Sequence, residues 1–260
     1  MLDMVFESLL DISRPQRLLD PDLRMNESEI LKVHFAVEEL LGNTPVQYVL
    51  NESFFFGLTF FVDKRVLIPR PETEELVDWV LKNPVMKNKK TKILDIGTGS
   101  GCIAVSLKKN IPEAEIWALD VSNAALEVAR KNASHHQVKI RFVEGDILSL
   151  NQPVHLPDFD TILSNPPYVR ESEKRFMKPN VLDFEPPLAL FVKDDDPLVF
   201  YKSILRFCEA RLKKNGFLYF EINREYGSQI AELLTSTGYY EIVIKADLSA
   251  NDRMVAARKL

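Results

Sequence analysis

Cysteine, histidine and tryptophan are scarce in this chain of 260 residues. It holds two cysteines, Cys102 and Cys208, which stand far apart and without the paired spacing of a zinc or iron–sulfur site. Because the four histidines form no ligand pattern with them, we expect no metal site. Free thiols are typical of a reducing compartment, which predicts a cytoplasmic protein.

A positive charge excess and long apolar runs are also missing. The 33 basic residues are outnumbered by 38 acidic ones, and the net charge of -5 provides no chain-wide basic footprint for nucleic acid. No apolar run reaches the length of a membrane span. The stretch Met1–Glu7 lacks the basic region of a targeting peptide. We therefore expect a protein that contacts no membrane and has no direct need for nucleic acid.

What is present suits a globular protein, with 46% hydrophobic and 27% charged residues. Residues 1–46 are predicted to be helical, because apolar residues recur at helical spacing and Asn26 supplies cap chemistry before the second stretch. Gly42 then ends that helix. The stretch is too short for an independent core, so we predict a small N-terminal helical domain that leans on the rest.

Residues 47–62 have a different character. Tyr48–Leu50 and Phe54–Phe61 are aromatic and β-prone, and Asn51 and Gly57 are turn residues. We predict a β-hairpin linker here, in which the phenylalanines serve packing rather than a ligand cage.

Residues 63–260 are predicted to form one α/β domain. Pro71 suits the first position of a helix. Beyond Thr91 strands alternate with helices, which implies a parallel sheet covered on both faces. The last two strands are separated by too few residues for a helix, so we expect them to be antiparallel at one edge. The predicted strands are residues 92–96, 115–119, 138–143, 160–164, 216–222, 239–245 and 253–258.

A glycine-rich turn, Gly97–Gly101, follows the first of these strands. Its glycines allow a tight turn and the close approach of a ligand. Ligands of doubly wound sheets bind beyond the carboxyl ends of the strands. Asp120 ends the second strand, where its carboxylate can accept hydrogen bonds from both ribose hydroxyls. We therefore predict a nucleoside-like cofactor at this edge.

The glycine spacing departs from the dinucleotide fingerprint. Together with Asp95, it resembles that of the class I S-adenosylmethionine (SAM) methyltransferases. In that superfamily an acidic residue at the position of Asp146 often holds the adenine amino group, and an apolar neighbour, here Ile147, packs on the ring. That Asp146 merely caps a turn is an equally open interpretation. The candidate cofactor-binding residues are Gly97, Thr98, Gly99, Ser100, Gly101, Asp120, Asp146, Ile147 and Asn165.

The second motif is Asn165-Pro166-Pro167-Tyr168, after the fourth strand. Neither proline can donate to a ladder, and each holds the residue before it extended. The Asn165 side chain and the Pro166 carbonyl thus become two rigid acceptors beside an aromatic ring, which suits a planar group that carries an NH2. The alternative is a strand-ending turn with a solvent-facing asparagine.

The first and fourth strands are neighbours in such a sheet, so the two motifs face one cleft. A planar NH2 is a poor nucleophile, and the largest help is to hold its nitrogen in line with the methyl carbon. Acceptors at Asn165 and Pro166 would grip its N–H bonds, while Tyr168 would cover the planar group. No strong general base is needed. We name Asn165, Pro166 and Tyr168 as catalytic candidates.

Five segments in order resemble the HemK/PrmC family, the release-factor glutamine N5-methyltransferases: Thr44–Leu50, Leu67–Glu74, Gly97–Gly101, Asn165–Tyr168 and Phe184–Leu190. The resemblance implies a class I, Rossmann-like fold with a seven-stranded, mostly parallel sheet. It also implies methyl transfer from SAM, with S-adenosylhomocysteine as product, to the glutamine of the Gly-Gly-Gln tripeptide in peptide chain release factors.

The resemblance also suggests which residues bind the substrate. Asn165, Pro166, Pro167 and Tyr168 would hold the glutamine side chain, and Arg70 and Glu72 at a helix start are further candidates. Glu221 ends the fifth strand, where it could contact a ligand or pair with a lysine.

Two departures from the family stand out. The helical domain is shorter than usual, and Asn51 replaces a common glycine, although asparagine tolerates the left-handed region.

We expect a monomer. Two alternatives remain, the first being an amino-methyltransferase for a flipped nucleic-acid base (adenine N6), which would need a basic groove. The second is a non-catalytic, translation-associated binding module.

Overall fold

A computed structural model of the chain describes residues 1–20, 22–87, 90–149 and 156–260. The helices are α1 (Leu2–Leu10), α2 (Arg14–Leu19), α3 (Glu27–Leu41), α4 (Val46–Leu50), α5 (Pro71–Lys82), α6 (Cys102–Asn110), α7 (Asn123–His135), α8 (Pro179–Leu182), α9 (Val199–Arg211) and α10 (Gly227–Ser236). The strands are β1 (Glu52–Phe55), β2 (Leu58–Phe61), β3 (Lys92–Ile96), β4 (Glu115–Asp120), β5 (Arg141–Glu144), β6 (Phe159–Ser164), β7 (Val169–Arg170), β8 (Phe191–Val192), β9 (Leu212–Glu221), β10 (Tyr239–Ala246) and β11 (Asp252–Lys259).

Seven strands form the main sheet in the order β10-β11-β9-β6-β3-β4-β5. The pairs from β9 to β5 are parallel, whereas β11 runs antiparallel to both β9 and β10. The predicted seven-stranded, mostly parallel sheet and its antiparallel edge are confirmed. The expected contact of the first and fourth strands is confirmed as well, since β3 pairs directly with β6.

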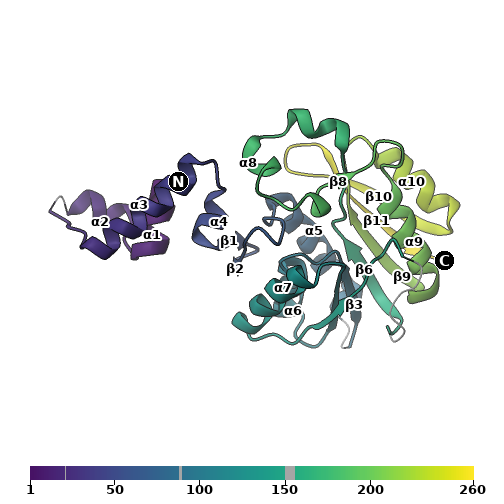
Figure 1. Cartoon of the computed structure of the whole chain (residues 1–260). Helices are drawn as coiled ribbons and strands as arrows, with labels where there is room; N and C mark the ends of the chain where they lie inside the picture. The colour runs from purple at the N-terminus through teal and green to yellow at the C-terminus, as the bar shows by residue number, and fades with distance from the viewer. Residues whose placement is uncertain (21, 88–89, 150–155) are drawn as a thin grey trace.

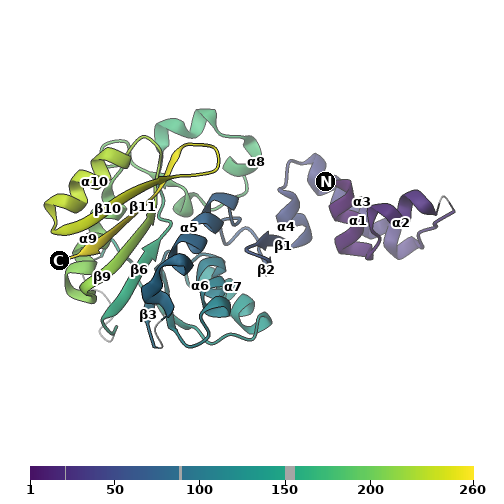
Figure 2. The ribbon, with the colours of Figure 1, turned by 180° about the vertical axis from the view of Figure 1, so that it is seen from behind.

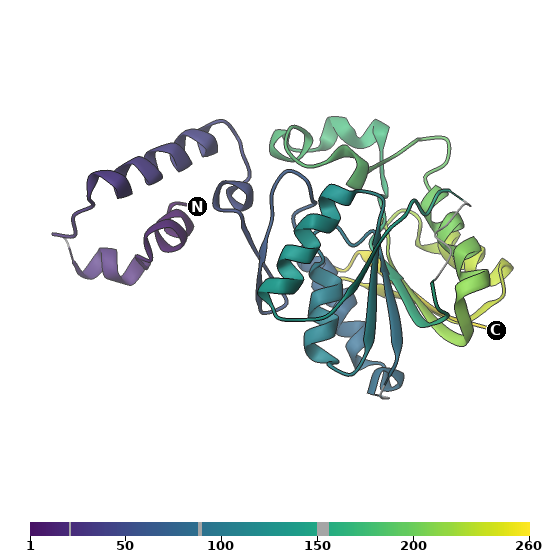
Figure 3. The same ribbon diagram turned by 60° about the horizontal axis from the view of Figure 1, so that its bottom comes forward.

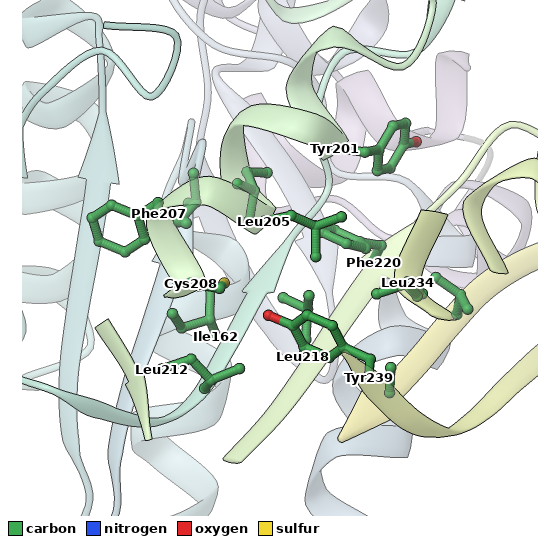
Figure 4. Packing of buried hydrophobic residues seen from close by; sticks show 14 of the residues in the cluster. Ile162, Tyr201, Leu205, Phe207, Cys208, Leu212, Leu218, Phe220, Leu234 and Tyr239 are labelled. Atoms are coloured by element: carbon green, nitrogen blue, oxygen red, sulfur yellow. The ribbon is translucent and has the colours of Figure 1, made fainter. Parts of the chain in front are cut away.

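Helices cover both faces of this sheet, because its central strands are apolar on both sides. Figure 3 shows α6 and α7 (blue to teal) on one side and α9 and α10 (green to yellow) on the other. Alternate residues of one strand belong to different cores: Ile162 of β6 packs toward α9 and α10, while Leu163 packs toward α5 and α6. Figure 4 shows the first core, in which Tyr201 and Leu205 of α9 lie over the strands.

The helices α1, α2 and α3 stand apart from the sheet, with α4 and the β1–β2 hairpin between them and the main body (Figure 1, Figure 2). Asn26 caps α3 in a reciprocal pattern with Glu29, as expected. Val5 of α1 and Ala36 of α3 are buried. The division into residues 1–46, 47–62 and 63–260 stays a prediction, although α4 crosses its first boundary.

The prediction of β structure for Tyr48–Leu50 is wrong, because these residues belong to helix α4. The Tyr48 hydroxyl donates to the Val66 carbonyl at 2.6 Å, and its ring packs with Val62. These tertiary contacts outweigh the β propensity of the segment. Asn51 ends the helix in the left-handed region (φ 54°), so the turn tolerates asparagine as expected.

The hairpin itself is confined to β1 and β2. Phe56 and Gly57 form its turn, both with positive φ (49° and 74°), as the twist of a two-residue hairpin requires. Phe55 and Phe60 are fully buried in the core beneath α5 and α6, with ring centroids 6.0 Å apart. Packing is therefore confirmed for Phe55 and Phe60, whereas Phe54 is exposed and the prediction fails for it.

The third parallel strand begins at Arg141, not at Val138 as predicted. Gln137 adopts a positive φ of 56° after α7, and its N–H donates to Ser134. The Val138 N–H donates back to the Ala133 carbonyl at 2.9 Å. Gln137 and Val138 thus belong to the end of α7, so they cannot start the strand. No helix in the described parts of the chain is both long and apolar enough to cross a membrane.

Candidate active site

A cavity of about 250 Å³ opens at the carboxyl ends of β3, β4 and β6. Gly97 and Gly99 contribute from the loop after β3, Asp120 from the end of β4, and Asn165 and Pro166 from the segment after β6. A Cβ built on Gly97 would lie 4.0 Å from the Asn165 carbonyl oxygen, so the two motifs meet. The parallel pairing of β3 with β4 and β6 brings these separate stretches to one edge.

Asp120 presents its carboxylate to this cavity. The Gly99 N–H donates to one oxygen at 2.9 Å, and the Ser122 N–H donates to the other at 2.9 Å. Burial raises the pKa of the Asp120 carboxyl despite these two donors and the Val121 N–H, which lower it. Because a carboxylate has about four lone-pair sites, these donors leave it able to accept a hydrogen bond from a ligand hydroxyl. A ribose, whose hydroxyls donate hydrogen bonds, fits this acceptor.

Of the five residues in the glycine loop, Gly97 and Gly99 line the cavity. They have φ values of 74° and 52°, which a residue with a side chain rarely adopts. Apart from its chain neighbours, no heavy atom of the described residues lies within 4 Å of a Cβ built on Gly99. The space beside this glycine is therefore open to a ligand that approaches the backbone.

Thr98, Ser100 and Gly101 do not line the cavity; they hold the loop. The Thr98 hydroxyl donates to Asp95 at 2.7 Å, and the Ser100 carbonyl accepts from the Asn132 side chain at 2.9 Å. Asp95 is fully buried, and burial raises the pKa of its carboxyl to about 7. Cofactor contact by Thr98, Ser100 and Gly101 stays a prediction.

Asn165 turns its amide nitrogen away from the cavity, toward the Thr73 hydroxyl at 3.1 Å. Among the described residues, no group donates to Asn165 Oδ1 or to the Pro166 carbonyl oxygen. Two unoccupied acceptors thus stand together on the cavity wall. Pro167 also lines it, and the two prolines keep this stretch of backbone stiff.

Tyr168, Arg70 and Glu72 lie outside the cavity lining. The Tyr168 hydroxyl donates to the buried Glu221 carboxylate at 3.1 Å, and Arg70 pairs with Glu185 at 2.6 Å. The roles predicted for Tyr168, Arg70 and Glu72 stay predictions.

The interpretation of Glu221 as a partner for a lysine is wrong. Its two oxygens accept from Thr73 (2.6 Å) and Tyr168, and it does not line the cavity. Burial raises the pKa of the Glu221 carboxyl, while these two donors and the charge of Arg253 act in the opposite direction.

Asp146 and Ile147 both line the cavity. Asp146 Oδ1 accepts from the Leu148 N–H at 2.9 Å, so the carboxylate caps a turn. Contact with an adenine amino group is compatible with this turn and stays a prediction, because a carboxylate can accept several hydrogen bonds.

Comparisons with known proteins agree with this geometry. A family model described as methyltransferase small domain matches residues 73–183. The release factor glutamine methyltransferase of Flavobacterium psychrophilum is 46% identical over 257 residues, which cover 97% of this chain and 88% of the relative. That of Bacteroides thetaiotaomicron is 41% identical over 258 residues, with coverages of 99% and 89%. The chain belongs to the release factor glutamine methyltransferase family.

A solved structure extends the comparison to the fold of this family member. The crystal structure of a methyltransferase from Pyrococcus furiosus matches with a TM-score of 0.57 and 18% identity, covering 85% of this chain and 96% of the other. At this identity the match concerns the fold alone. It supports the Rossmann-like architecture of the sheet and its covering helices.

Sequence reasoning missed part of the cavity wall of this member of the release factor glutamine methyltransferase family. Val66 and Leu67 line it from one side, and Pro186, Leu188 and Ala189 from another. The buried Glu185 joins the two segments, because it pairs with Arg70 and accepts from the Ile68 N–H at 3.3 Å. Both segments carry the family resemblance, but no residue type in them signals a ligand contact.

Proposed function

We propose that this chain transfers a methyl group from SAM to the side-chain amide nitrogen (N5) of the glutamine in the Gly-Gly-Gln tripeptide of peptide chain release factors. One observation carries the proposal: the unoccupied acceptors at Asn165 and Pro166 share a cavity with Gly97, Gly99 and Asp120. Membership of the release factor glutamine methyltransferase family supports the choice of a glutamine amide over other NH2 groups.

The cofactor would lie along the glycine loop. Asp120 would accept its ribose hydroxyls, Gly97 and Gly99 would let it approach the backbone, and Asp146 and Ile147 would face its base. When bound, SAM supplies a methyl group on a positively charged sulfur and is released as S-adenosylhomocysteine. The cavity walls, which include Leu67 and Leu188, are largely apolar. They limit the access of water to the positive charge on sulfur, which disperses during methyl transfer.

The glutamine amide would be held by the Asn165–Tyr168 segment. Asn165 Oδ1 and the Pro166 carbonyl would each accept one N–H of the amide, which turns the face of its nitrogen toward the methyl carbon. Pro167 keeps these acceptors fixed before substrate arrives. The alkylated nitrogen is acidic enough to lose its proton to water, so no side chain has to act as a strong base. Tyr168, Arg70 and Glu72 would assist substrate binding from outside the cavity.

A labelling experiment tests the proposal. The full chain is incubated with methyl-labelled SAM and one of three substrates: a release factor, the same factor with glutamate in place of the tripeptide glutamine, or bulk DNA and RNA. Label is expected on the first substrate and absent from the glutamate control, because a carboxylate offers no N–H to the two acceptors.

Two outcomes would overturn the assignment. Label on nucleic acid, with none on the release factor, would indicate a base amino-methyltransferase. Absence of label with retained release-factor binding would indicate a non-catalytic binding module.

We also propose that the chain works as a monomer in the cytoplasm, where translation termination takes place, without binding a membrane. The buried, unpaired thiols of Cys102 and Cys208 are compatible with that reducing compartment. Sedimentation of the purified chain tests the monomer, and a dimer that persists on dilution would contradict it.

A further inference from the structure

A chain of hydrogen bonds runs from the cavity wall into the core. Asn165 Nδ2 donates to Thr73 Oγ1 at 3.1 Å, and the Thr73 hydroxyl donates to Glu221 Oε2 at 2.6 Å. The Tyr168 hydroxyl donates to Glu221 Oε1 at 3.1 Å. Thr73 and Glu221 are 3% and 1% exposed, so water does not compete for these bonds.

The sheet register accounts for the meeting of these residues. Ser164 of β6 stands opposite Phe220 of β9, so Asn165 and Glu221 follow at the carboxyl ends of neighbouring parallel strands. Thr73 lies in the first turn of α5. Three stretches remote in sequence therefore supply one polar network below the cavity.

The hydrogen bonds of this network can run in only one direction, from Asn165 through Thr73 to Glu221. Both oxygens of Glu221 act as acceptors, one toward Thr73 and the other toward Tyr168, so the single proton of the Thr73 hydroxyl goes to Glu221. Thr73 then has only lone pairs to offer Asn165, and the Asn165 group that faces it must be the NH2. The Asn165 carbonyl oxygen is consequently left for the cavity.

We propose that Thr73 and Glu221 are positioning residues that hold the Asn165 amide with Oδ1, and not Nδ2, toward the substrate. The inference rests on the proposed function, in which Oδ1 accepts an N–H of the glutamine amide. A flipped Asn165 would set its own NH2 against the substrate NH2, leaving two donors face to face and the nitrogen out of line. Thr73 and Glu221 act without lining the cavity.

Thr73→Val tests the inference against Thr73→Ser. Valine has the shape of threonine but no acceptor, so Asn165 loses its orientation; serine keeps the hydroxyl. For Thr73→Val we expect kcat to fall about tenfold or more relative to Thr73→Ser, with the Kd of SAM nearly unchanged. Thr73→Ser should keep most of the wild-type kcat. A smaller difference in kcat, or an equal loss in both variants, would overturn the inference.

A reversed network provides a second test, which also applies if Thr73→Val does not fold. In the Asn165→Asp variant a carboxylate oxygen faces the lone pairs of the Thr73 hydroxyl, so two acceptors meet. This variant should lose most activity. Adding Glu221→Gln supplies an NH2 that donates to Thr73, which frees the Thr73 proton for the carboxylate introduced by Asn165→Asp. The hydrogen bonds then run from position 221 through Thr73 to position 165, and a carboxylate oxygen at position 165 faces the cavity. The total charge of the two residues is unchanged.

We expect N165D/E221Q to be at least about tenfold more active than N165D, which a sum of independent defects cannot produce. A double variant no more active than N165D would refute the network. The proposed function is judged separately, because it fails only if the wild-type chain places no label on the release-factor glutamine.

Discussion

The carboxylate of Asp120 performs two tasks at the end of β4. It accepts the backbone N–H of Gly99, which holds the glycine loop, and it faces the cavity with its remaining lone pairs. The short Asp120 side chain thus supports the glycine loop and at the same time offers an acceptor to a ligand. Asn165 does the same after β6, since its NH2 is held by Thr73 and its oxygen remains available.

Asp120→Ala should weaken SAM binding about tenfold to 100-fold, because it removes a charged acceptor for the ribose hydroxyls. The Kd measured by calorimetry checks this. Glu144→Ala is a matched control, because Glu144 stands opposite Asp120 on β5 but is exposed and does not line the cavity. A wild-type Kd for Asp120→Ala would contradict the assignment.

Asn165→Ala should abolish methyl transfer while the Kd of SAM changes little, since the alanine leaves the Asp120 side of the cavity intact. Single-turnover rates and calorimetry on the same preparation check both halves of this expectation. Unchanged turnover would refute the role given to the asparagine.

At the scale of elements, the start of α6 is pressed closely onto α7. Gly101 caps α6 with a φ of 79°, and a Cβ built on it would lie 3.0 Å from Ala129 Cβ. This close approach lets the glycine loop sit directly on the neighbouring helix. The glycine serves packing here, in contrast to Gly97 and Gly99, which leave room for a ligand.

Gly101→Ala should destabilise the fold by about 3 kcal/mol, because a strained φ and overpacking add. Gly238→Ala is the matched control: Gly238 has a φ of 83°, but within the described parts of the chain only its sequence neighbours come within 4 Å of its built Cβ. It should lose only about 1 kcal/mol, the cost of the left-handed conformation. Urea unfolding compares the two, and equal losses would argue against crowding at Ala129.

At the scale of the whole molecule, the carboxyl edge of the sheet gathers buried acids. Asp95 stands near the end of β3 and Glu221 ends β9, and burial raises the pKa of both carboxyl groups. Asp95 resists ionisation in the folded chain but ionises freely in the unfolded one, whereas at Glu221 the hydroxyls of Thr73 and Tyr168 and the charge of Arg253 oppose the effect of burial. The stability of the fold therefore depends on pH through the buried carboxyl group of Asp95.

The raised pKa of Asp95 predicts how the stability of the fold changes with pH. Its pKa is about 7 in the folded chain and lies near the ordinary 3.8 when unfolded. The folded state thus binds the extra proton between these values, and its stability falls as pH rises from about 4 to 7. The unfolding free energy of Asp95→Asn, relative to wild type, should shift in favour of the variant by about 2–4 kcal/mol from pH 4 to 8.

Chemical denaturation across this pH range measures the difference. Asp183→Asn serves as control, because Asp183 is exposed. A relative stability of Asp95→Asn that does not change with pH would show that Asp95 ionises normally in the folded chain.

Local patterns predicted most of the elements, and the failures have local causes. Cap residues such as Asn26 and Pro71 act on their own helix, so their effect is visible without tertiary contacts. The helix at Tyr48 was missed because its hydroxyl bond to Val66, 18 residues away, decides the conformation. The late start of β5 was missed because Gln137 adopts a left-handed turn that its residue type does not announce.

The sequence by itself determined the alternation of strands and helices, the glycine loop, the acceptor motif at Asn165 and the family. These follow from residue type and spacing along the chain. Only the tertiary structure decided that Thr73 and Glu221 lie behind Asn165, and that Glu185 joins the two further segments of the wall. The physical reason is that a buried polar side chain must find its partner in space, and here the partners stand 92 and 115 residues apart.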